Sequence, residues 1–322
     1  MKRVLVVAIP PTLELDVIGP VSAFSKADEF IRSAGGGPAY RVEVISGGKS
    51  RTIAGAFGVG LVAASRYKDV RGSVDTLLVA GGPGARASAS SDLLAWLKRM
   101  ATRTRRVGSV CTGAFVLAQA GLLSGRSAAT HWAHAKELHR RYPDVTVDAD
   151  SIWLRDHDIV TSAGMCAGID LSLALVEEDY GAEIALAVAR ELVVYLRRPG
   201  GQSQFSVALA AQKSERRPFR ELVYWIGQHL REDLRIPSLA ERANMSERNF
   251  VRVFNREVGM GPGRYVDVVR AEAARQRLET TDETIDEVAD RCGFASREVL
   301  RRAFVRIVGT TPAEYRKRFR TA

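Results

Sequence analysis

SLAERANMSERNFVRVFNREVGMGPGRY, residues 238–265, has a counterpart fifty residues later in VADRCGFASREVLRRAFVRIVGTTPAEY, residues 288–315. Five positions recur at the same spacing, occupied by Phe250, Phe254, Gly259, Pro262 and Tyr265 in the first stretch and by Leu300, Phe304, Gly309, Pro312 and Tyr315 in the second. Further upstream, Ala240 and Arg242 correspond to Ala289 and Arg291, so the second copy holds one more residue in its turn. Self-similarity at a fixed period indicates a duplicated structural unit.

Each copy has the signals of two helices joined by a short turn. In the first copy Ser238 is the predicted N-cap of one helix, Asn244 and Met245 form the turn, and Ser246 is the predicted N-cap of the next helix. The second copy carries the corresponding signals at Thr284, Gly293 and Ser296. A helix predicted over Pro262–Leu278 joins the copies and spans about 25 Å.

The second helix of each copy has one apolar side and one side suited to DNA. Arginine can bridge O6 and N7 of guanine, asparagine can bridge N6 and N7 of adenine, and glutamate can accept a hydrogen bond from N4 of cytosine. An ordinary surface helix also carries arginines that are solvated or paired with Glu247 or Glu298. Two copies set about one DNA turn apart nevertheless favour a DNA interface. The predicted DNA-binding residues are Ser246, Arg248, Asn249, Arg252, Ser296, Arg297, Glu298, Arg301 and Arg302.

Residues 1–198 alternate short apolar runs with amphipathic stretches. The predicted strands are 3–9, 40–46, 74–80, 107–110 and 159–162, and the predicted helices are 20–31, 93–101, 114–120, 132–141, 169–180 and 183–197. Strands that are apolar on both faces and separated by helices predict a mainly parallel sheet covered on both sides. No strand-like alternation occurs beyond about residue 218. The predicted fold is therefore an α/β sandwich followed by an all-α domain.

Length, composition and charge agree with two folded domains. The chain has 322 residues, of which 46% are hydrophobic and 26% charged, and this excludes disordered, collagenous and membrane-dominated classes. Residues 199–217, which begin with Pro199, Gly200 and Gly201, form the predicted linker between domains 1–198 and 218–322. The net charge of +10 favours polyanionic partners, and residues 213–322 hold 23 basic against 17 acidic residues.

Targeting segments and metal sites are not predicted. The N-terminus is a poor signal peptide, and glycine and polar residues interrupt the longest uncharged stretch, between Arg106 and Arg126, so no membrane span is expected. The three cysteines, Cys111, Cys166 and Cys292, lack the spacing of a disulfide framework or a zinc site. We expect no cofactor, no metal and a cytoplasmic location.

The stretch VGSVCTGAFVLAQAGLL, residues 107–123, places Cys111 between a buried strand and a helix, with Gly113 permitting a tight turn. This arrangement is typical of a nucleophile elbow, here with a thiol, and a helix N-terminus favours the thiolate. Cys111 can also be a buried small residue that fills the turn, and His131 can simply cap a helix. Ligands bind at the carboxyl edge of such sheets. The candidate catalytic residues are Cys111 and Asp16, and the predicted ligand pocket comprises Asp16, Gly82, Cys111, Thr112, His131, Trp132 and Cys166.

Residues 218–322 closely resemble the DNA-binding domain of AraC-type transcriptional regulators. The stretch VADRCGFASREVLRRAF, residues 288–304, and the following GTTPAEYRKRF, residues 309–319, carry the resemblance. It implies two helix-turn-helix units linked by a long helix, with the predicted DNA-binding residues close to bases or phosphates.

Residues 1–195 resemble the PfpI-like branch of the class I glutamine amidotransferase-like superfamily, which implies a flavodoxin-like fold. The fused pair is similar to regulators of the GlxA type. LDVIGP, residues 15–20, and the CTG elbow, residues 111–113, are similar to isocyanide hydratase, and this resemblance places Asp16 and Cys111 at catalytic positions. PfpI-type peptidases have histidine directly after the nucleophilic cysteine, where this chain has Thr112, so peptidase activity is not expected.

Together these features predict a transcriptional regulator that binds double-stranded DNA. The resemblance implies a small effector, nitrogenous in kind, that an aromatic wall at Trp132 can hold by cation–π attraction. A homodimer through residues 1–195 is expected, and RNA polymerase is a further candidate partner. One alternative is an enzyme of the PfpI-like class that hydrates or hydrolyses a small substrate through Cys111. Another is a constitutive DNA-binding protein whose α/β domain only dimerises.

Overall fold

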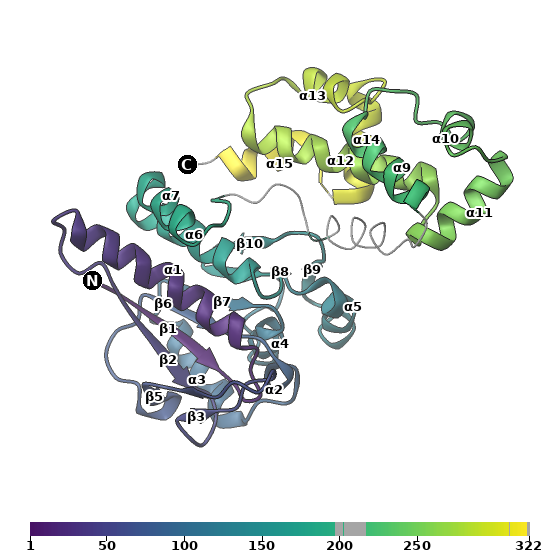
Figure 1. The fold of residues 1–322 in the computed structure, drawn as a ribbon. Helices are drawn as coiled ribbons and strands as arrows, with labels where there is room; N and C mark the ends of the chain where they lie inside the picture. Colours follow the sequence, from purple (N-terminus) through teal and green to yellow (C-terminus); the bar gives the residue numbers. More distant parts are fainter. Residues whose placement is uncertain (197–201, 203–216, 309, 321–322) are drawn as a thin grey trace. The chain divides into compact units, whose positions relative to one another are not determined.

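The computed structural model describes residues 1–196, 202, 217–308 and 310–320. The chain divides into two compact units, 1–198 and 199–322, which are described separately (Figure 1). Nearly all of the predicted linker, 199–217, lies outside the described residues, and so do Arg197 and Gly309.

The first unit is built on a seven-stranded sheet in the order β10-β11-β7-β6-β1-β2-β5. Its strands are β1 Lys2–Ala8, β2 Tyr40–Ser46, β5 Ser65–Arg66, β6 Thr76–Val79, β7 Arg106–Val110, β10 Trp153–Asp156 and β11 Ile159–Ser162. All neighbouring pairs are parallel except β10 and β11, which form an antiparallel hairpin at one edge. The central strands β6 and β7 are buried along their whole length, as apolar residues on both faces require. The predicted mainly parallel sheet is confirmed.

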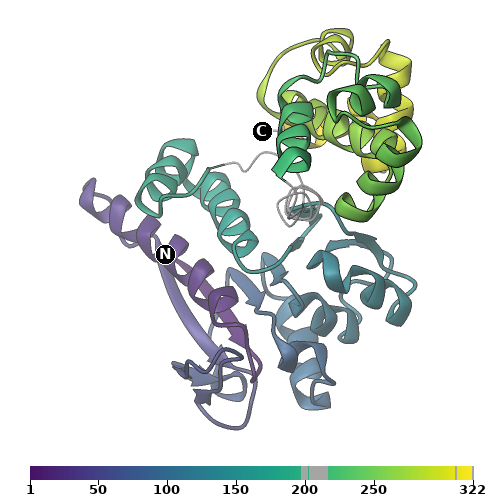
Figure 2. The same ribbon diagram turned by 45° about the vertical axis from the view of Figure 1, so that its right-hand side comes forward.

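Helices cover both faces of this sheet (Figure 2). On one face, α1, α6 and α7 pack through residues such as Phe24, Leu171 and Val188. On the other face, α3, α4 and α5 contribute Leu97, Phe115 and Leu138 to a second core. The bounds are α1 Glu14–Ser33, α3 Ser91–Ala101, α4 Gly113–Gln119, α5 Trp132–Arg141, α6 Ala167–Tyr180 and α7 Ala182–Glu191.

The differences from the sequence-based prediction concern helix ends and short elements. Helix α1 begins at Glu14 rather than at Pro20, which lies inside the helix at the cost of one backbone hydrogen bond. Helix α7 ends at Glu191, where Val193 adopts a positive φ of 54°, instead of continuing to Arg197. The unpredicted elements have two to four residues each, too few for a periodic pattern. Besides β5 and β10 they are β3 Thr52–Ile53, β4 Leu61–Val62, η1 Tyr67–Asp69, α2 Pro83–Arg86, β8 Ser127–Ala129 and β9 Thr146–Asp148.

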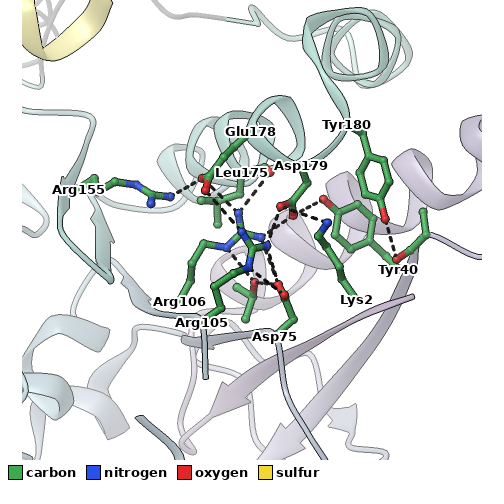
Figure 3. A network of polar contacts seen from close by, with 12 residues as sticks. Lys2, Tyr40, Asp75, Arg105, Arg106, Arg155, Leu175, Glu178, Asp179 and Tyr180 are labelled. Carbon is green, nitrogen blue, oxygen red and sulfur yellow. Dashed lines mark hydrogen bonds and ion pairs between the residues drawn. The ribbon is translucent and has the colours of Figure 1, made fainter. Parts of the chain in front are cut away.

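A network of charged side chains closes the amino edge of the sheet (Figure 3). At its centre Arg106, only 1% exposed, pairs with Asp179 at 2.6 Å. Tyr40 donates a hydrogen bond to the same carboxylate at 2.7 Å, and Arg105 contacts it at 2.6 Å. Burial opposes ionisation of Asp179, but the charge of Arg106 and these hydrogen bonds hold its pKa below the ordinary value. The network therefore ties the carboxyl end of α6 to the starts of β2 and β7.

The second unit is helical and repeats its packing. Its helices are α9 Arg217–Gln228, α10 Ile236–Arg242, α11 Glu247–Val258, α12 Pro262–Thr280, α13 Ile285–Arg291, α14 Arg297–Val308 and α15 Pro312–Arg320. The first repeat packs Phe254 edge-on to Tyr265 with ring centroids 5.5 Å apart, and the second packs Phe304 against Tyr315 in the same way at 5.4 Å. The positions that match in the sequence are thus equivalent in the core.

Two capping predictions have different outcomes. Thr284, the predicted start of a helix, is the N-cap of α13, and it also forms a capping box with Glu287. Ser238, the predicted N-cap of the first repeat, lies inside α10, which begins at Ile236 after Arg235. The prediction is wrong because Pro237 sets the first turn, and the Ser238 hydroxyl instead donates to Asp233 at 2.6 Å. Among the described helices, none combines the length and the hydropathy needed to span a membrane.

Candidate functional site

Cys111 stands at the sharp turn between β7 and α4. Its backbone φ is +56°, a conformation that is uncommon for a residue with a side chain and typical of strained turns at functional sites. The Cys111 N–H donates to the carbonyls of Ser162 and Ala163, at 3.1 and 3.0 Å, so the adjacent strand β11 holds the turn. Gly113 follows directly because a Cβ there would lie 2.1 Å from the carbonyl oxygen of Val79. The elbow predicted from the sequence is present.

Asp16 lies beside Cys111 although 95 residues separate them in the chain. It belongs to the first turn of α1, where its Oδ2 accepts a hydrogen bond from the Gly81 N–H at 3.1 Å. A Cβ on Gly81 would lie 2.5 Å from Asp16 Oδ2 and 2.8 Å from Cys111 Cβ, so the three residues are in tight contact. They follow β1, β6 and β7, which are neighbours in the sheet, and therefore meet at its carboxyl edge.

Burial sets the charge of both side chains. Asp16 is 0% exposed, and this burial raises its pKa from 3.8 to about 7, although the Gly81 and Met165 N–H groups and the Cys111 thiol favour the ionised form. Burial and the neighbouring Asp16 charge raise the pKa of the Cys111 thiol to about 12. A thiol with so high a pKa is protonated at neutral pH and a weak nucleophile.

Thr112 and Gly82 tie the elbow to the loop after β6. The Gly82 N–H donates to Thr112 Oγ1 at 2.8 Å, and the threonine hydroxyl donates back to the Gly82 carbonyl at 3.2 Å. Thr112 is buried, so the position that holds histidine in PfpI-type peptidases is used here for packing and hydrogen bonding.

Three predicted residues lie at the margin of this site. His131 is the N-cap of α5, and its Nδ1 accepts from the Ala133 N–H at 3.2 Å, which is a structural role. Its ring packs on Gly164, where a Cβ would lie 2.2 Å from His131 Cδ2. Burial and the nearby His134 lower the pKa of His131. Trp132 is 51% exposed, and Cys166, at the start of α6 beside Met165, is exposed too.

Glu14, two residues before Asp16 on α1, was not predicted, and its carboxylate contacts the loop that holds Phe57 and Val59. Its Oε1 accepts hydrogen bonds from the Phe57 and Val59 N–H groups at 2.9 and 3.2 Å. Although burial opposes ionisation, these backbone donors lower the pKa of Glu14. Among the described residues, Glu14 Oε2 and Asp16 Oδ1 are buried oxygens without a hydrogen-bond partner. The position of Glu14, two residues before Asp16, was the one available signal in the sequence.

The candidate DNA interface consists of the two helix-turn-helix units. In the first turn, the N–H groups of Asn244 and Met245 donate to the carbonyls of Glu241 and Ala240, both at 2.9 Å. In the second turn, Gly293 and Phe294 make the same bonds 49 residues later, at 3.0 and 2.9 Å. The helices that follow, α11 and α14, each have 12 residues and bury one side of their surface.

The predicted DNA-binding residues lie mainly on the outer sides of α11 and α14. The exposed ones are Ser246, Arg248, Arg252, Ser296, Arg297, Glu298, Arg301 and Arg302. Asn249 is half-buried, and its Oδ1 accepts from Arg252 at 2.8 Å, so its amide is engaged within the helix. Arg301 forms two 2.9 Å hydrogen bonds to Glu298, and Ser296 accepts from the Val299 N–H at 3.3 Å. These pairs orient the arginines at the helix surface.

Family comparisons match both units. The DJ-1/PfpI family model matches residues 2–178, and a Helix-turn-helix domain model matches residues 239–318. The two matches coincide with the parts that hold the Cys111 elbow and the two helix-turn-helix units.

The curated relatives include transcriptional regulators. The HTH-type transcriptional regulator GbdR of Pseudomonas aeruginosa is 31% identical to this chain. The matched region covers 76% of this chain and 66% of GbdR, just under two thirds of that protein. The regulator Rv1931c of Mycobacterium tuberculosis is 31% identical over 76% of this chain and 96% of its own length. The regulator GlxA of Rhizobium meliloti is 26% identical over 92% of each chain. An isonitrile hydratase of Pseudomonas putida matches a smaller part, 37% of this chain and 51% of its own, at 36% identity.

A solved structure agrees with the fold of the first unit. Drosophila melanogaster DJ-1beta superposes on 60% of this chain with a TM-score of 0.52 and 22% identity. At this identity the likeness concerns the fold alone. The three regulators are named as HTH-type, and residues 239–318 of this chain match the model of a helix-turn-helix domain.

Proposed function

Because this chain belongs to the DJ-1/PfpI family and carries a helix-turn-helix domain like that of its regulator relatives, we propose that it is a sequence-specific DNA-binding transcriptional regulator controlled by a small effector. The observation that carries the proposal is the duplication. Two turns with the same hydrogen bonds present two 12-residue helices whose outer sides hold exposed arginines. The 19-residue helix α12 joins them and is about 28 Å long, close to one DNA turn.

The effector binds at the carboxyl edge of the sheet in the first unit, at the site of Asp16 and Cys111. The buried Asp16 Oδ1, which has no hydrogen-bond partner, attracts a ligand that donates a hydrogen bond or carries positive charge. The exposed ring of Trp132 offers a face for cation–π attraction. These features favour a small nitrogenous metabolite, and the burial of Asp16 means that the site opens when the ligand enters.

Catalysis through Cys111 is the second candidate function, favoured by the elbow geometry and by the partial likeness to isonitrile hydratase. The protonation state of the site argues against it, since a thiol with a pKa of about 12 is a poor nucleophile at neutral pH. We expect negligible turnover of isocyanides and peptides by the wild-type chain. Steady-state turnover that is lost in both Cys111→Ser and Asp16→Asn would favour the enzyme.

The proposed regulator acts in the cytoplasm as a homodimer formed by the first unit. Exposed apolar side chains on this unit support self-association, and they include Leu15, Ile18, Phe57, Val59 and Val62. RNA polymerase is a further candidate partner.

The DNA proposal is tested with the full chain and a pool of random duplexes. Wild-type protein should select duplexes that footprinting shows to have two contact patches one helical turn apart. Arg248→Ala and Arg301→Ala should each weaken binding by about 1–3 kcal/mol where the arginine contacts a base. Arg140→Ala, an exposed arginine of the first unit, is the control and should bind normally. A single short footprint, or no sequence preference at low salt, would contradict two DNA-reading units.

The effector proposal is tested by thermal shift with amino acids, betaines and related metabolites. A bound effector stabilises the folded chain by RT ln(1 + [L]/Kd), about 2.7 kcal/mol at one hundred times Kd. The shift should be lost in Asp16→Asn and largely kept in Cys111→Ser, because a hydroxyl fills the same space. A positive compound should also change binding to the selected duplex. If no compound changes DNA binding, the first unit serves assembly rather than sensing.

A further inference from the structure

The two helix-turn-helix units have separate hydrophobic cores. The first core gathers Phe250, Phe254 and Tyr265, and the second gathers Leu300, Phe304 and Tyr315. Helix α12 contributes to both, with Val266 in the first core and Leu278 in the second. The angle between the two helix-turn-helix units therefore depends on α12 and on contacts that join the two units directly.

One such contact surrounds the carbonyl oxygen of Leu230, in the loop between α9 and α10. Arg270 of α12 donates to this oxygen from Nε at 3.0 Å and from Nη2 at 2.7 Å. Arg270 is half-buried in this contact, and burial lowers the pKa of its guanidinium. Arg231, the next residue, pairs with Asp290 of α13 at 3.3 Å. The loop between α9 and α10 precedes the first helix-turn-helix unit. It therefore contacts α12 through Arg270 and α13 of the second helix-turn-helix unit through Arg231.

Gly293 provides the space for this contact. A Cβ at Gly293 would lie 1.8 Å from the Leu230 carbonyl oxygen and 3.0 Å from Arg270 Nε. Asn244 holds the equivalent position in the first turn, with the same hydrogen bonds and a positive φ of 52° against 75° for Gly293. The left-handed turn itself therefore accepts asparagine, and the close approach of Leu230 is the feature that requires glycine in the second copy.

We propose that Leu230, Arg270 and Gly293 form a clamp that fixes the second helix-turn-helix unit relative to the first and thereby determines which spacing of DNA contacts the chain accepts. The inference rests on the proposed DNA-binding function. Inserting one base pair between the two contact patches moves one patch by 3.4 Å and rotates it by about 34° around the duplex. A clamped pair of reading helices cannot follow this displacement, whereas a pair joined by α12 alone can adjust.

The variant that tests the clamp is Gly293→Asn, because asparagine keeps the left-handed turn and adds the Cβ that meets Leu230. The matched control is Asn244→Gly, which makes the reverse exchange at the equivalent position of the first turn. Arg270→Gln is a second, milder variant that removes the two hydrogen bonds without adding bulk. Far-UV circular dichroism establishes that each full-length variant is folded.

The first measurement is the distance between spin labels at Arg252→Cys and Arg302→Cys, two exposed positions on α11 and α14, in a chain that also carries Cys166→Ser. We expect one narrow distance distribution in this chain and with Asn244→Gly, and a broad or shifted one with Gly293→Asn and Arg270→Gln. A broad distribution without the clamp substitutions, or an unchanged one in both folded clamp variants, would overturn the proposal.

The second measurement uses duplexes selected by the wild-type chain, with one base pair inserted or removed between the patches. Wild type and Asn244→Gly should lose about tenfold or more in affinity, and the clamp variants about threefold or less, relative to their own binding of the selected duplex. Equal discrimination by folded clamp variants would overturn the clamp as the determinant of spacing. If the wild type selects no duplex but its narrow distance broadens in Gly293→Asn, the DNA-binding proposal fails and the clamp itself is supported.

Discussion

Burial governs the protonation of the two side chains at the centre of the candidate ligand site. Asp16 and Cys111 are both closed off from water, and their pKa values rise to about 7 and about 12. The sequence predicts the opposite for the thiol, because a cysteine at a helix N-terminus gains thiolate character. That expectation leaves out desolvation, and burial of the sulfur is the largest cause of its raised pKa.

The raised pKa of Asp16 predicts a specific dependence of stability on pH. The folded state keeps the Asp16 proton up to about pH 7, while the unfolded state releases it near pH 3.8. The contribution of neutral Asp16 to the free energy of unfolding is therefore fully present below about pH 4 and is lost as the pH rises to 7. Asp16→Asn removes this loss and should gain up to about 4 kcal/mol over wild type between pH 4 and pH 8, at about 1.4 kcal/mol per pKa unit. Thermal unfolding at several pH values measures it.

The exposed Asp144→Asn is the control for this experiment. A stability difference between wild type and Asp16→Asn that is the same at pH 4 and at pH 8 would contradict the raised pKa.

The three thiols should differ in reactivity. Cys166 is exposed, whereas burial raises the pKa of Cys111 to about 12 and that of Cys292 to about 11. Iodoacetamide at neutral pH should therefore modify Cys166 first and the other two only after denaturation, as peptide mass mapping can establish. Modification of Cys111 ahead of Cys166 in the folded chain would indicate an activated thiolate and favour the enzymatic alternative.

At the scale of helices and strands, long sequence patterns predicted the bounds of elements correctly. Where two residues compete as the start of a helix, the sequence pattern alone did not identify the right one. The strand Tyr40–Ser46 and the helix Trp132–Arg141 have the predicted bounds, because long apolar or amphipathic runs leave few alternatives. Ser238 was misplaced because Pro237 is a stronger start signal.

The candidate site was predictable in part. Cys111 and Asp16 each follow a recognisable strand, so their meeting at one sheet edge follows from the topology. Glu14 and Met165 were missed because their roles depend on which backbone groups face the site, and no periodicity records that.

The ion-pair network at the amino edge of the sheet predicts that replacing Arg106 lowers the stability of residues 1–198 strongly. Arg106→Met leaves the buried Asp179 carboxylate short of its main partner and should destabilise the first unit by about 3 kcal/mol or more in urea unfolding. Arg32→Met is the control, because the pair of Arg32 with Asp28 is more exposed and should contribute less than about 1 kcal/mol. The double variant Arg106→Met, Asp179→Leu should recover part of the loss, and no recovery would argue against a buried ion pair as the cause.

At the scale of the whole molecule, the apolar surface of the first unit is the feature that most needs a partner. Phe57 and Val62 are 70% and 74% exposed, and Ile18 is 42% exposed on the neighbouring helix α1. The backbone bonds from Phe57 and Val59 to Glu14 hold the loop against the start of that helix. Exposed apolar surface of this kind typically marks an interface.

We therefore expect Phe57→Glu to convert a dimeric chain to a monomer, as light scattering would show, because a charge cannot be buried in a symmetric apolar contact. Tyr224→Glu, at an aromatic residue 73% exposed on the helical unit, is the control and should remain dimeric. Light scattering of the separated units locates the contact. Dimerisation of residues 199–322 alone would reverse the proposed roles.

The strand order of the sheet has a consequence for biosynthesis. Strand β7 ends at Val110, but its outer neighbour β11 is complete only at Ser162, and the Cys111 turn takes its backbone hydrogen bonds from Ser162 and Ala163. At about 5–20 residues per second, a ribosome needs roughly 3–10 s to add the intervening segment. If the sheet forms during synthesis, we expect the edge of β7 to stay unpaired and the Cys111 thiol to stay unshielded during that interval. The candidate ligand site would then be completed only after Ala163 has been added, and Cys111 should be more reactive in a nascent chain that ends before β11 than in the folded protein.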